Sequence, residues 1–241
     1  ATSEVFPLIK TGGLADVSGS LPSALQHLGV DIRILVPGYT AVINALTDLH
    51  HLAHLTHLPV IGQAELLLGT IQETQVKVIV IKAAGIYERA GGPYADANGL
   101  EWLDNPVRFG VLSKVAAMLG GPNSPLPDWQ PNIVHCNDWQ TGLTPAYMKL
   151  VEHAQAKSVI SLHNMAFQGC YAPSWLPTLG LPSTHFTLEG LEYHGQLSFL
   201  KAGIFYADSI TTVSPSYAKE IQTPAFGFGL EGLLSKRSSE L

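Results

Sequence analysis

Short apolar runs, each followed by polar or glycine-rich residues, constrain the fold of this chain most, because they predict buried strands. The clearest run is Val76-Lys77-Val78-Ile79-Val80-Ile81, which is rich in β-branched residues. Further strands are predicted over residues 30–36, 65–72, 132–137, 157–162 and 208–213. Hydrophobic residues make up 46% of the 241-residue chain and charged residues only 13%, which is typical of elements buried on both faces. The sequence therefore predicts an α/β fold, with a Rossmann-like parallel sheet flanked by helices.

Periodic apolar residues predict a first helix that begins near Gly13. Its apolar side chains recur every three or four residues, at Leu14, Val17, Leu21, Leu25 and Leu28. Gly29 is a helix-stop residue, and Pro22 predicts either a kink or a fresh helix start capped by Ser20. Further helices are predicted over residues 104–119, 196–206 and 215–222, the last behind a serine cap, with short helices in the loop-rich segment 170–195. Arg108, on the second helix, is interpreted as structural.

The segment Lys10-Thr11-Gly12-Gly13-Leu14-Ala15-Asp16 places a lysine and two glycines at the start of the first helix. Consecutive glycines leave backbone N–H groups free to turn toward a ligand, and a helix start adds partial positive charge. Because Lys10 adds a full charge, the segment suits a phosphate or diphosphate. It matches neither the G-x-G-x-x-G fingerprint nor the G-x-x-x-x-G-K-[ST] loop. A plain loop that enters a helix, with Lys10 in solvent, remains an alternative on these residues alone.

Two polar clusters follow predicted strands. Asn137 and Asp138 come directly after one strand, and His163 and Asn164 after the next one along the chain. In open parallel sheets, ligands bind at the carboxyl ends of the strands. As alternatives, Asp138 caps the helix that follows, and a lone histidine after a strand is more often a structural residue. Asn164 and Gln168 carry amide groups of the kind that orient sugar hydroxyls.

The loop Ala90-Gly91-Gly92-Pro93-Tyr94-Ala95-Asp96 is too rich in glycine and proline to form regular structure. Tyr94 offers a flat ring with a hydroxyl group, and a sugar site needs both. The alternative is that Tyr94 is a packing lid.

Composition excludes several functions. The net charge of −6 argues against a broad nucleic-acid-binding surface. Cys136 and Cys170 have no metal or redox spacing and point to a reducing compartment. The sequence shows no signal peptide and no apolar run long enough to span a bilayer. We therefore expect an intracellular protein whose partners include neither nucleic acid nor membrane.

Four histidines cluster with helical spacing in the segment 39–63, which has no clear structural pattern: His50, His51, His54 and His57. A metal site and a polar surface stripe are both consistent with this cluster. Only Asp48 is close enough in sequence to complete a coordination set, so the stripe is favoured. We expect neither a metal nor a cofactor.

The segment 3–16, S-E-V-F-P-L-I-K-T-G-G-L-A-D, resembles the N-terminal signature of bacterial glycogen synthases and plant starch synthases. Residues 135–139 match the family pattern H-x-x-D-W, and residues 163–169 match H-N-x-x-[FY]-Q-G. Residues 199–218 and 224–234 are similar to the bacterial branch. Gln140 departs from the pattern, since many members have histidine there, and it is given no role.

The resemblance implies the GT-B fold, in which two Rossmann-like domains face each other across a cleft. It also implies retaining transfer of glucose from ADP-glucose to the non-reducing end of an α-1,4-glucan such as glycogen. In that family the residue at Lys10 contacts the donor diphosphate, and the one at Tyr94 lines the sugar cleft. We expect catalytic roles for Asp138, in the active-site cleft, and His163, against the transferred glucose. Donor or substrate binding is expected at Lys10, Gly12, Gly13, Asp16, Tyr94, Asn164 and Gln168.

The resemblance covers residues 1–241 as one N-terminal domain, with its first strand truncated and the C-terminal nucleotide-binding domain absent. That missing domain is an expected partner, because in the family it holds most of the ADP pocket. We expect this chain alone to be inactive and to bind ADP-glucose weakly. Residues 224–234 favour a bacterial, cytoplasmic protein over a plant protein of the plastid. Two alternatives are a GT-B transferase that uses another nucleotide sugar and a glucan-binding half-domain without chemistry.

Overall fold

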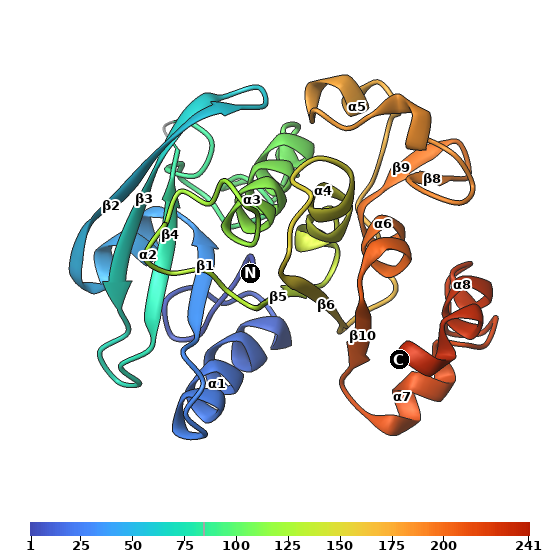
Figure 1. Ribbon diagram of the computed structural model, residues 1–241, viewed down its shortest axis with the longest axis horizontal. Coiled ribbons are helices and arrows are strands. Elements are labelled where there is room, and N and C mark those ends of the chain that lie inside the picture. Colours follow the sequence, from blue (N-terminus) through green and yellow to red (C-terminus); the bar gives the residue numbers. More distant parts are fainter. Residues whose placement is uncertain (84) are drawn as a thin grey trace. The chain divides into compact units, whose positions relative to one another are not determined.

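The computed structural model describes residues 1–83 and 85–241 (Figure 1). The chain divides into two compact units, residues 1–112 and residues 113–241. Helix α3 (Asn105–Leu119) contains the boundary between them, begins one residue after the predicted start and ends where predicted. No helix within the described ranges is long and apolar enough to cross a membrane.

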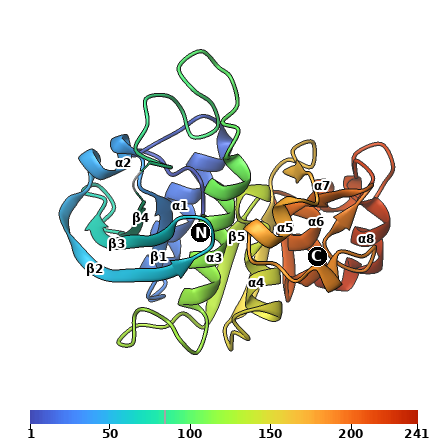
Figure 2. The ribbon, with the colours of Figure 1, turned by 90° about the horizontal axis from the view of Figure 1, so that it is seen from above.

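The first unit is built on a four-stranded sheet in the order β1-β4-β3-β2 (Figure 1). β1 (Arg33–Pro37) and β4 (Lys77–Lys82) pair in parallel, and β3 (Gly62–Thr70) runs antiparallel to β4. β2 (Thr47–Leu58) forms a long, curved hairpin with β3 (Figure 2). The predicted parallel pairing therefore holds for β1 and β4, and the hairpin extends the sheet with antiparallel strands. The short helix α2 (Thr40–Ala45) connects β1 to this hairpin.

The four clustered histidines all lie on β2, and all are exposed. The interpretation of their spacing as helical is wrong. Register irregularities at three places in the hairpin break the two-residue alternation of a strand and so imitate a helical period. Leu55 and Leu58, between and after them, are buried. Among the described residues, no group of three His, Cys, Asp or Glu side chains is placed to hold a metal ion.

Helix α1 (Gly13–His27) begins at the predicted glycines, and Gly29 adopts a φ of +84° just beyond its end. The helix is continuous through Pro22. Ser20 donates its hydroxyl to the carbonyl of Asp16 at 2.8 Å, so the predicted fresh start with a Ser20 cap is wrong.

The buried face of α1 consists mainly of small residues rather than the predicted leucines. It comprises Leu14, Ala15, Ser18, Gly19 and Pro22. Leu28, by contrast, is 80% exposed. The N-terminal segment crosses the helix here, since Phe6 donates its N–H to the carbonyl of Ala15 at 3.0 Å. A Cβ atom at Gly19 would lie 2.4 Å from the carbonyl oxygen of Phe6, so only glycine permits this approach.

The second unit contains a parallel three-stranded sheet in the order β10-β6-β5 (Figure 1). Its strands are β5 (Ile133–Asn137), β6 (Lys157–Leu162) and β10 (Ser209–Thr212), each within one residue of the predicted bounds. Helices α4 (Thr144–Leu150) and α6 (Phe199–Tyr206) contact each other, and α4 also contacts β6. The predicted parallel α/β architecture is confirmed here.

A small antiparallel sheet, ordered β7-β9-β8, accounts for one wrong boundary. The helix predicted over residues 196–206 begins only at Phe199, because residues 196–198 form β9 instead. Ser198 then caps α6 by accepting the N–H of Lys201 at 3.2 Å. The strands of this sheet are β7 (Cys170–Tyr171), β8 (Glu192–Tyr193) and β9 (Gln196–Ser198).

The remaining helices are short. Ser214 caps α7 as predicted, although that helix ends two residues before the expected end. The guanidinium of Arg237 donates to the carbonyls of Phe205 and Ala207 at 3.3 and 2.7 Å and so caps the end of α6. The short helices are α5 (Trp175–Thr178), α7 (Pro215–Glu220) and α8 (Glu231–Lys236), with 3₁₀ turns at Trp139–Thr141, Ser183–His185 and Ser238–Glu240.

Candidate functional site

The loop before α1 is held by one buried carboxylate, that of Glu4, which is 2% exposed. Its Oε2 accepts the backbone N–H groups of Thr11 and Gly12, and its Oε1 accepts the Thr11 hydroxyl at 2.7 Å. Tyr94, from the loop between β4 and α3, donates its hydroxyl to the same carboxylate. Glu4 therefore fixes the loop that carries Lys10 and ties it to Tyr94.

Lys10 and Asp16 face each other across the first turn of α1. The ammonium of Lys10 lies 2.7 Å from both carboxylate oxygens of Asp16, and the two side chains are 45% and 54% exposed. An exposed pair of this kind contributes only about 0–1 kcal/mol, since water competes for both charges. A more highly charged anion can displace Asp16 from Lys10 at little cost.

Gly12 and Gly13 are not explained by packing within the described part of the chain. A Cβ atom at either position would meet nothing within 4 Å. Gly12 has φ −145° and ψ −170°, an extended conformation that any residue adopts. The fold thus leaves open space beside the start of α1, where backbone N–H groups and the helix dipole favour an anion.

Tyr94 is half-buried, and its hydroxyl is engaged. Besides the bond to Glu4, the hydroxyl lies 2.9 Å from that of Ser3. Its ring packs against Phe109 with centroids 5.8 Å apart. Burial, reinforced by the negative charge of Glu4, raises the pKa of Tyr94 well above its ordinary value, so the phenol is neutral. Its role as a sugar contact stays a prediction.

Asp138 directly follows β5 and is 7% exposed. Its Oδ1 accepts the backbone N–H of His163 at 2.7 Å and that of Asn164 at 3.4 Å. Its side chain does not cap the 3₁₀ turn that follows, so the capping interpretation is wrong. Instead the carboxylate joins the ends of two neighbouring parallel strands, β5 and β6.

The backbone of Asp138 is strained, with φ 55° and ψ −170°. Side-chain-bearing residues rarely adopt this conformation, which costs of order 1–3 kcal/mol. Such strain persists only where the surroundings enforce it, and it gathers at functional sites. Strain combined with a buried carboxylate makes Asp138 the strongest candidate in the second unit.

His163 is held by its neighbour across the sheet. Its Nε2 lies 3.0 Å from Oδ1 of Asn137. With this oxygen accepting, Nε2 carries the hydrogen and Nδ1 is a lone-pair acceptor. Burial lowers the pKa of His163, so the ring is neutral at pH 7. A neutral ring of this tautomer can accept a sugar hydroxyl without adding charge.

A second histidine, His135, takes part in a chain of hydrogen bonds across the same sheet. Nε2 of His135 lies 2.6 Å from the hydroxyl of Ser161, which lies 2.7 Å from that of Thr211. These residues sit on β5, β6 and β10, so the chain of hydrogen bonds crosses the whole sheet. Burial lowers the pKa of His135 to about 4.

The amides of Asn164 and Gln168 hold loops as well as facing outward. Oδ1 of Asn164 accepts the N–H of Ala166 at 3.0 Å, which forms a local turn. Nε2 of Gln168 donates to the carbonyl of Phe228 at 2.9 Å. Asn164 is exposed and Gln168 half-buried, so both remain within reach of solvent and ligands.

The predicted site residues fall into two sets, one in each unit. Lys10, Gly12, Gly13, Asp16 and Tyr94 are connected within the first unit through Glu4 and the start of α1. The second unit gathers Asp138, His163 and Asn164 at the ends of β5 and β6, with Gln168 in the following loop. Sequence reasoning gave no role to Glu4. Only its place in the motif at residues 3–16 could have singled it out.

Comparisons with known proteins agree with the fold and with the sequence resemblance. Residues 1–236 match the family described as the starch synthase catalytic domain. The chain is 51% identical over its whole length to the glycogen synthase of Nitrosomonas europaea and 50% identical to that of Paramagnetospirillum magneticum. It covers 49% of each of these proteins, so it spans about half the length of its curated relatives.

A solved structure gives the same picture. The catalytic domain of starch synthase IV from Arabidopsis thaliana, bound to ADP and acarbose, superposes on 99% of this chain with a TM-score of 0.83 and 27% sequence identity. The match again covers 49% of the other chain. The α/β architecture of this chain is therefore that of a GT-B catalytic domain.

Proposed function

Because this chain belongs to the starch synthase catalytic domain family, we propose that it is the N-terminal part of a bacterial glycogen synthase. The complete enzyme transfers glucose from ADP-glucose, with retention, to the non-reducing end of an α-1,4-glucan. Whole-length identity of about 50% to bacterial glycogen synthases supports this proposal. We also propose that the protein is cytoplasmic and of bacterial origin, and the organisms of these relatives support the bacterial origin.

The Lys10 loop binds the donor diphosphate in this proposal. The observation that carries it is the exposed Lys10–Asp16 pair beside two glycines that no packing among the described residues requires. A diphosphate replaces Asp16 as the partner of Lys10 and takes the N–H groups at the start of α1. Lys10 then stabilises the negative charge that develops on the leaving diphosphate.

The second unit positions the glucose. Nδ1 of His163 accepts a glucose hydroxyl, and Asp138 holds the backbone of His163 and Asn164 in place. In the transfer step, the bond from the anomeric carbon to the diphosphate breaks, and a bond to the acceptor hydroxyl forms on the same face. The departing diphosphate takes the hydroxyl proton. The protein contributes position and charge stabilisation, and no metal is required.

Transfer needs the second domain of the family fold, since both domains must close on the donor to align it and exclude water. The 241-residue chain by itself therefore binds ADP-glucose weakly and does not elongate glucan. Elongation of glycogen by this chain alone would contradict the proposal that the second domain is required.

The direct test is glucose transfer from ADP-glucose to glycogen by the complete enzyme, with UDP-glucose as the competing donor. Lys10→Ala should lower kcat/KM for ADP-glucose by about 100-fold, the scale seen when a group that stabilises leaving charge is removed. Lys82→Ala is the matched control, because Lys82 is 43% exposed and also pairs with a carboxylate, that of Glu65. His163→Ala should act similarly to Lys10→Ala, with the exposed His54→Ala as its control.

Three results would overturn the proposal. The first is transfer from UDP-glucose in preference to ADP-glucose. The second is binding of glucan without any transfer. The third is a Lys10→Ala variant that is no more impaired than Lys82→Ala.

A further inference from the structure

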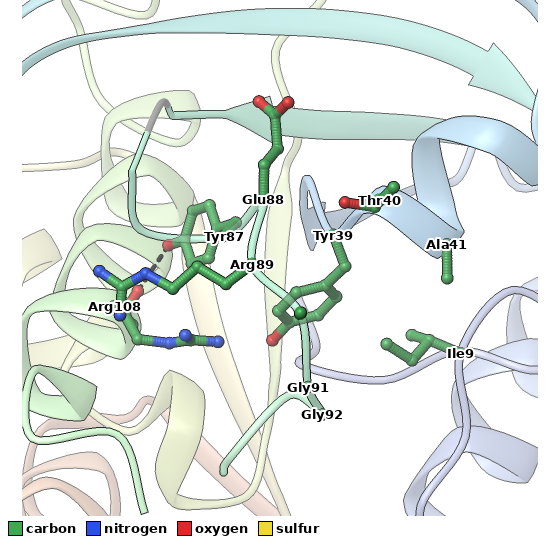
Figure 3. A pocket seen from close by; sticks show the side chains of 11 residues that line it. Ile9, Tyr39, Thr40, Ala41, Tyr87, Glu88, Arg89, Gly91, Gly92 and Arg108 are labelled. Atoms are coloured by element: carbon green, nitrogen blue, oxygen red, sulfur yellow. Dashed lines mark hydrogen bonds between the residues drawn. The ribbon is translucent and has the colours of Figure 1, made fainter. Parts of the chain in front are cut away.

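The first unit contains a pocket of about 460 Å³ that includes none of the nine predicted site residues (Figure 3). Its walls come from the N-terminal segment before α1, the loop between β1 and α2, α2 itself, the loop after β4, and helix α3. Tyr39 and Tyr87 form aromatic walls, Ile9 and Ala41 form apolar ones, and the Gly91-Gly92 backbone closes one side. A volume of this size is typical of sites for small molecules.

Arg108 brings a buried charge to this pocket. The residue is 1% exposed, and its Nη2 donates to the carbonyl of Pro93 at 2.8 Å. Within the described ranges, its Nε and Nη1 have no hydrogen-bond partner, and the guanidinium makes no ion pair. The rings of Tyr39, Tyr87 and Trp102 surround it at 5.4–6.0 Å, which favours a cation without satisfying its N–H groups.

Tyr39 supplies a second unpaired group. It is 5% exposed, and its hydroxyl has no hydrogen-bond partner among the described residues. Figure 3 shows this hydroxyl and the guanidinium of Arg108 pointing toward one another. Burial raises the pKa of Tyr39 well above its ordinary value, an effect that the charge of Arg108 partly offsets. The phenol is therefore neutral and available as a donor.

The other charges that line the pocket are already paired or point elsewhere. Arg89 donates to the carboxylate of Asp104 and to the carbonyl of Gly85. The side chain of Glu88 points away from Arg108 in Figure 3. The charge of Glu4 also acts on Tyr39, but the Glu4 carboxylate already accepts hydrogen bonds from the Lys10 loop and from Tyr94. The uncompensated charge facing the pocket is that of Arg108.

We propose that this pocket is a binding site for a small phosphorylated molecule, whose phosphate group is held by Arg108 Nε and Nη1 and by the Tyr39 hydroxyl. A buried guanidinium with unpaired N–H groups is costly, and an oxyanion both neutralises it and accepts those hydrogens. The apolar walls and the volume leave room for an organic body attached to the phosphate. Lys10 is not among the residues that line the pocket, and the proposal does not depend on the diphosphate contact there.

Calorimetric titration of the complete enzyme tests the site, with inorganic phosphate, glycerol 3-phosphate and uncharged glycerol as probes. The Lys10→Ala variant serves as the background, so that the donor site does not contribute. We expect both phosphates to bind and glycerol not to bind. Tighter binding of glycerol 3-phosphate than of inorganic phosphate identifies a phosphomonoester as the ligand class, and the reverse order identifies free phosphate.

Two variants locate the binding. Tyr39→Phe removes only an unpaired hydroxyl and should keep the fold while weakening phosphate binding about 10-fold, the value of one hydrogen bond. Arg108→Gln should abolish binding, and its folding is checked by circular dichroism. Phosphate affinity that survives Tyr39→Phe unchanged, or that vanishes with Lys10→Ala alone, would overturn the proposal.

A crystal of the enzyme soaked in selenate gives an independent readout. An anomalous peak between Arg108 and Tyr39 supports the site. A peak found only beside Lys10, or none in the first unit, contradicts it.

Discussion

The Lys10 loop of the first unit and the strand ends of the second unit hold their polar groups in opposite ways. Lys10 and Asp16 are about half exposed and form an ion pair with each other, beside a loop that is held by the carboxylate of Glu4. Asp138 and His163 sit at the ends of parallel strands, in a partly buried network with a strained backbone. One set is arranged by a loop, and the other by the sheet itself.

This difference separates two uses of charge. The exposed pair can open when an anion arrives, since little free energy holds it closed. The strand-end network is formed before any ligand binds, so a sugar meets groups that need no rearrangement. Substitution of Lys10 should therefore cost ligand affinity with little loss of stability, whereas substitutions in the strand-end network should also cost stability.

The largest expected effect is a loss of stability at low pH that results from the burial of His135 in the second unit. Its folded pKa of about 4 lies below the ordinary value of 6.5, because burial disfavours the charged ring. Protonation therefore favours the unfolded state, and stability present above pH 6.5 is lost as the pH falls toward 4. At 1.36 kcal/mol per pH unit, the difference corresponds to about 3 kcal/mol in the free energy of unfolding.

Urea unfolding between pH 7 and pH 4 measures this loss. His135→Gln keeps a polar partner for Ser161 but cannot titrate, so its pH dependence in this range should be shallower. Some dependence should remain, because the pKa of His163 is also lowered by burial and acts with the same sign. An identical pH profile for the wild type and His135→Gln would show that the sheet does not hold this histidine neutral.

The next effect distinguishes strain from hydrogen bonding at Asp138. Asp138→Ala removes the buried acceptor of the His163 N–H and should lower the free energy of unfolding by about 2 kcal/mol. Asp138→Gly removes the same acceptor but relieves the strained backbone, which is worth of order 1–3 kcal/mol. A glycine variant is ordinarily less stable than the matching alanine variant. If Asp138→Gly is instead more stable than Asp138→Ala, the backbone at this position is strained. The opposite ranking would mean that the backbone is not strained.

Much of the second unit could be predicted from the sequence because its order is local. The apolar runs of β5, β6 and β10 predict buried parallel strands, and the residues that follow them meet at one edge of the sheet. Asp138 and His163 are therefore predictable as neighbours. That Asp138 bonds the backbone of His163 rather than capping its own turn depends on the register between strands, which no local pattern contains.

The first unit was harder to predict because distant residues decide its details. Glu4 is buried because Tyr94, ninety residues away, and the Thr11 loop both donate to it. The small-residue face of α1 is buried because the N-terminal segment crosses it, which helical periodicity does not show. The histidines of β2 imitate a helix because the strand is irregular. In each case tertiary contacts override a local pattern.

Glu4 allows the comparison to be tested within the first unit. Glu4→Gln keeps an oxygen for the N–H groups of Thr11 and Gly12 but loses the charge, so it should lower the free energy of unfolding by about 1 kcal/mol. Because the Lys10 loop and Tyr94 both lose hydrogen bonds to a charged carboxylate, KM for ADP-glucose should rise several-fold while kcat changes less. Glu65→Gln, at a 41% exposed carboxylate, is the control. Equal KM values for ADP-glucose in the two variants would show that Glu4 does not contribute to donor binding.

The smallest effect on stability is expected at Lys10 itself. Lys10→Ala and its matched control Lys82→Ala should each change the free energy of unfolding by less than about 0.5 kcal/mol, since both lysines are in exposed ion pairs. Stabilisation by bound ADP should distinguish the two variants. At ten times its Kd, a ligand stabilises the protein by about 1.4 kcal/mol, and this gain should persist in Lys82→Ala and vanish in Lys10→Ala. If Lys10→Ala instead costs well over 1 kcal/mol without ADP, the loop is part of the folded framework, and the contrast between the two units fails.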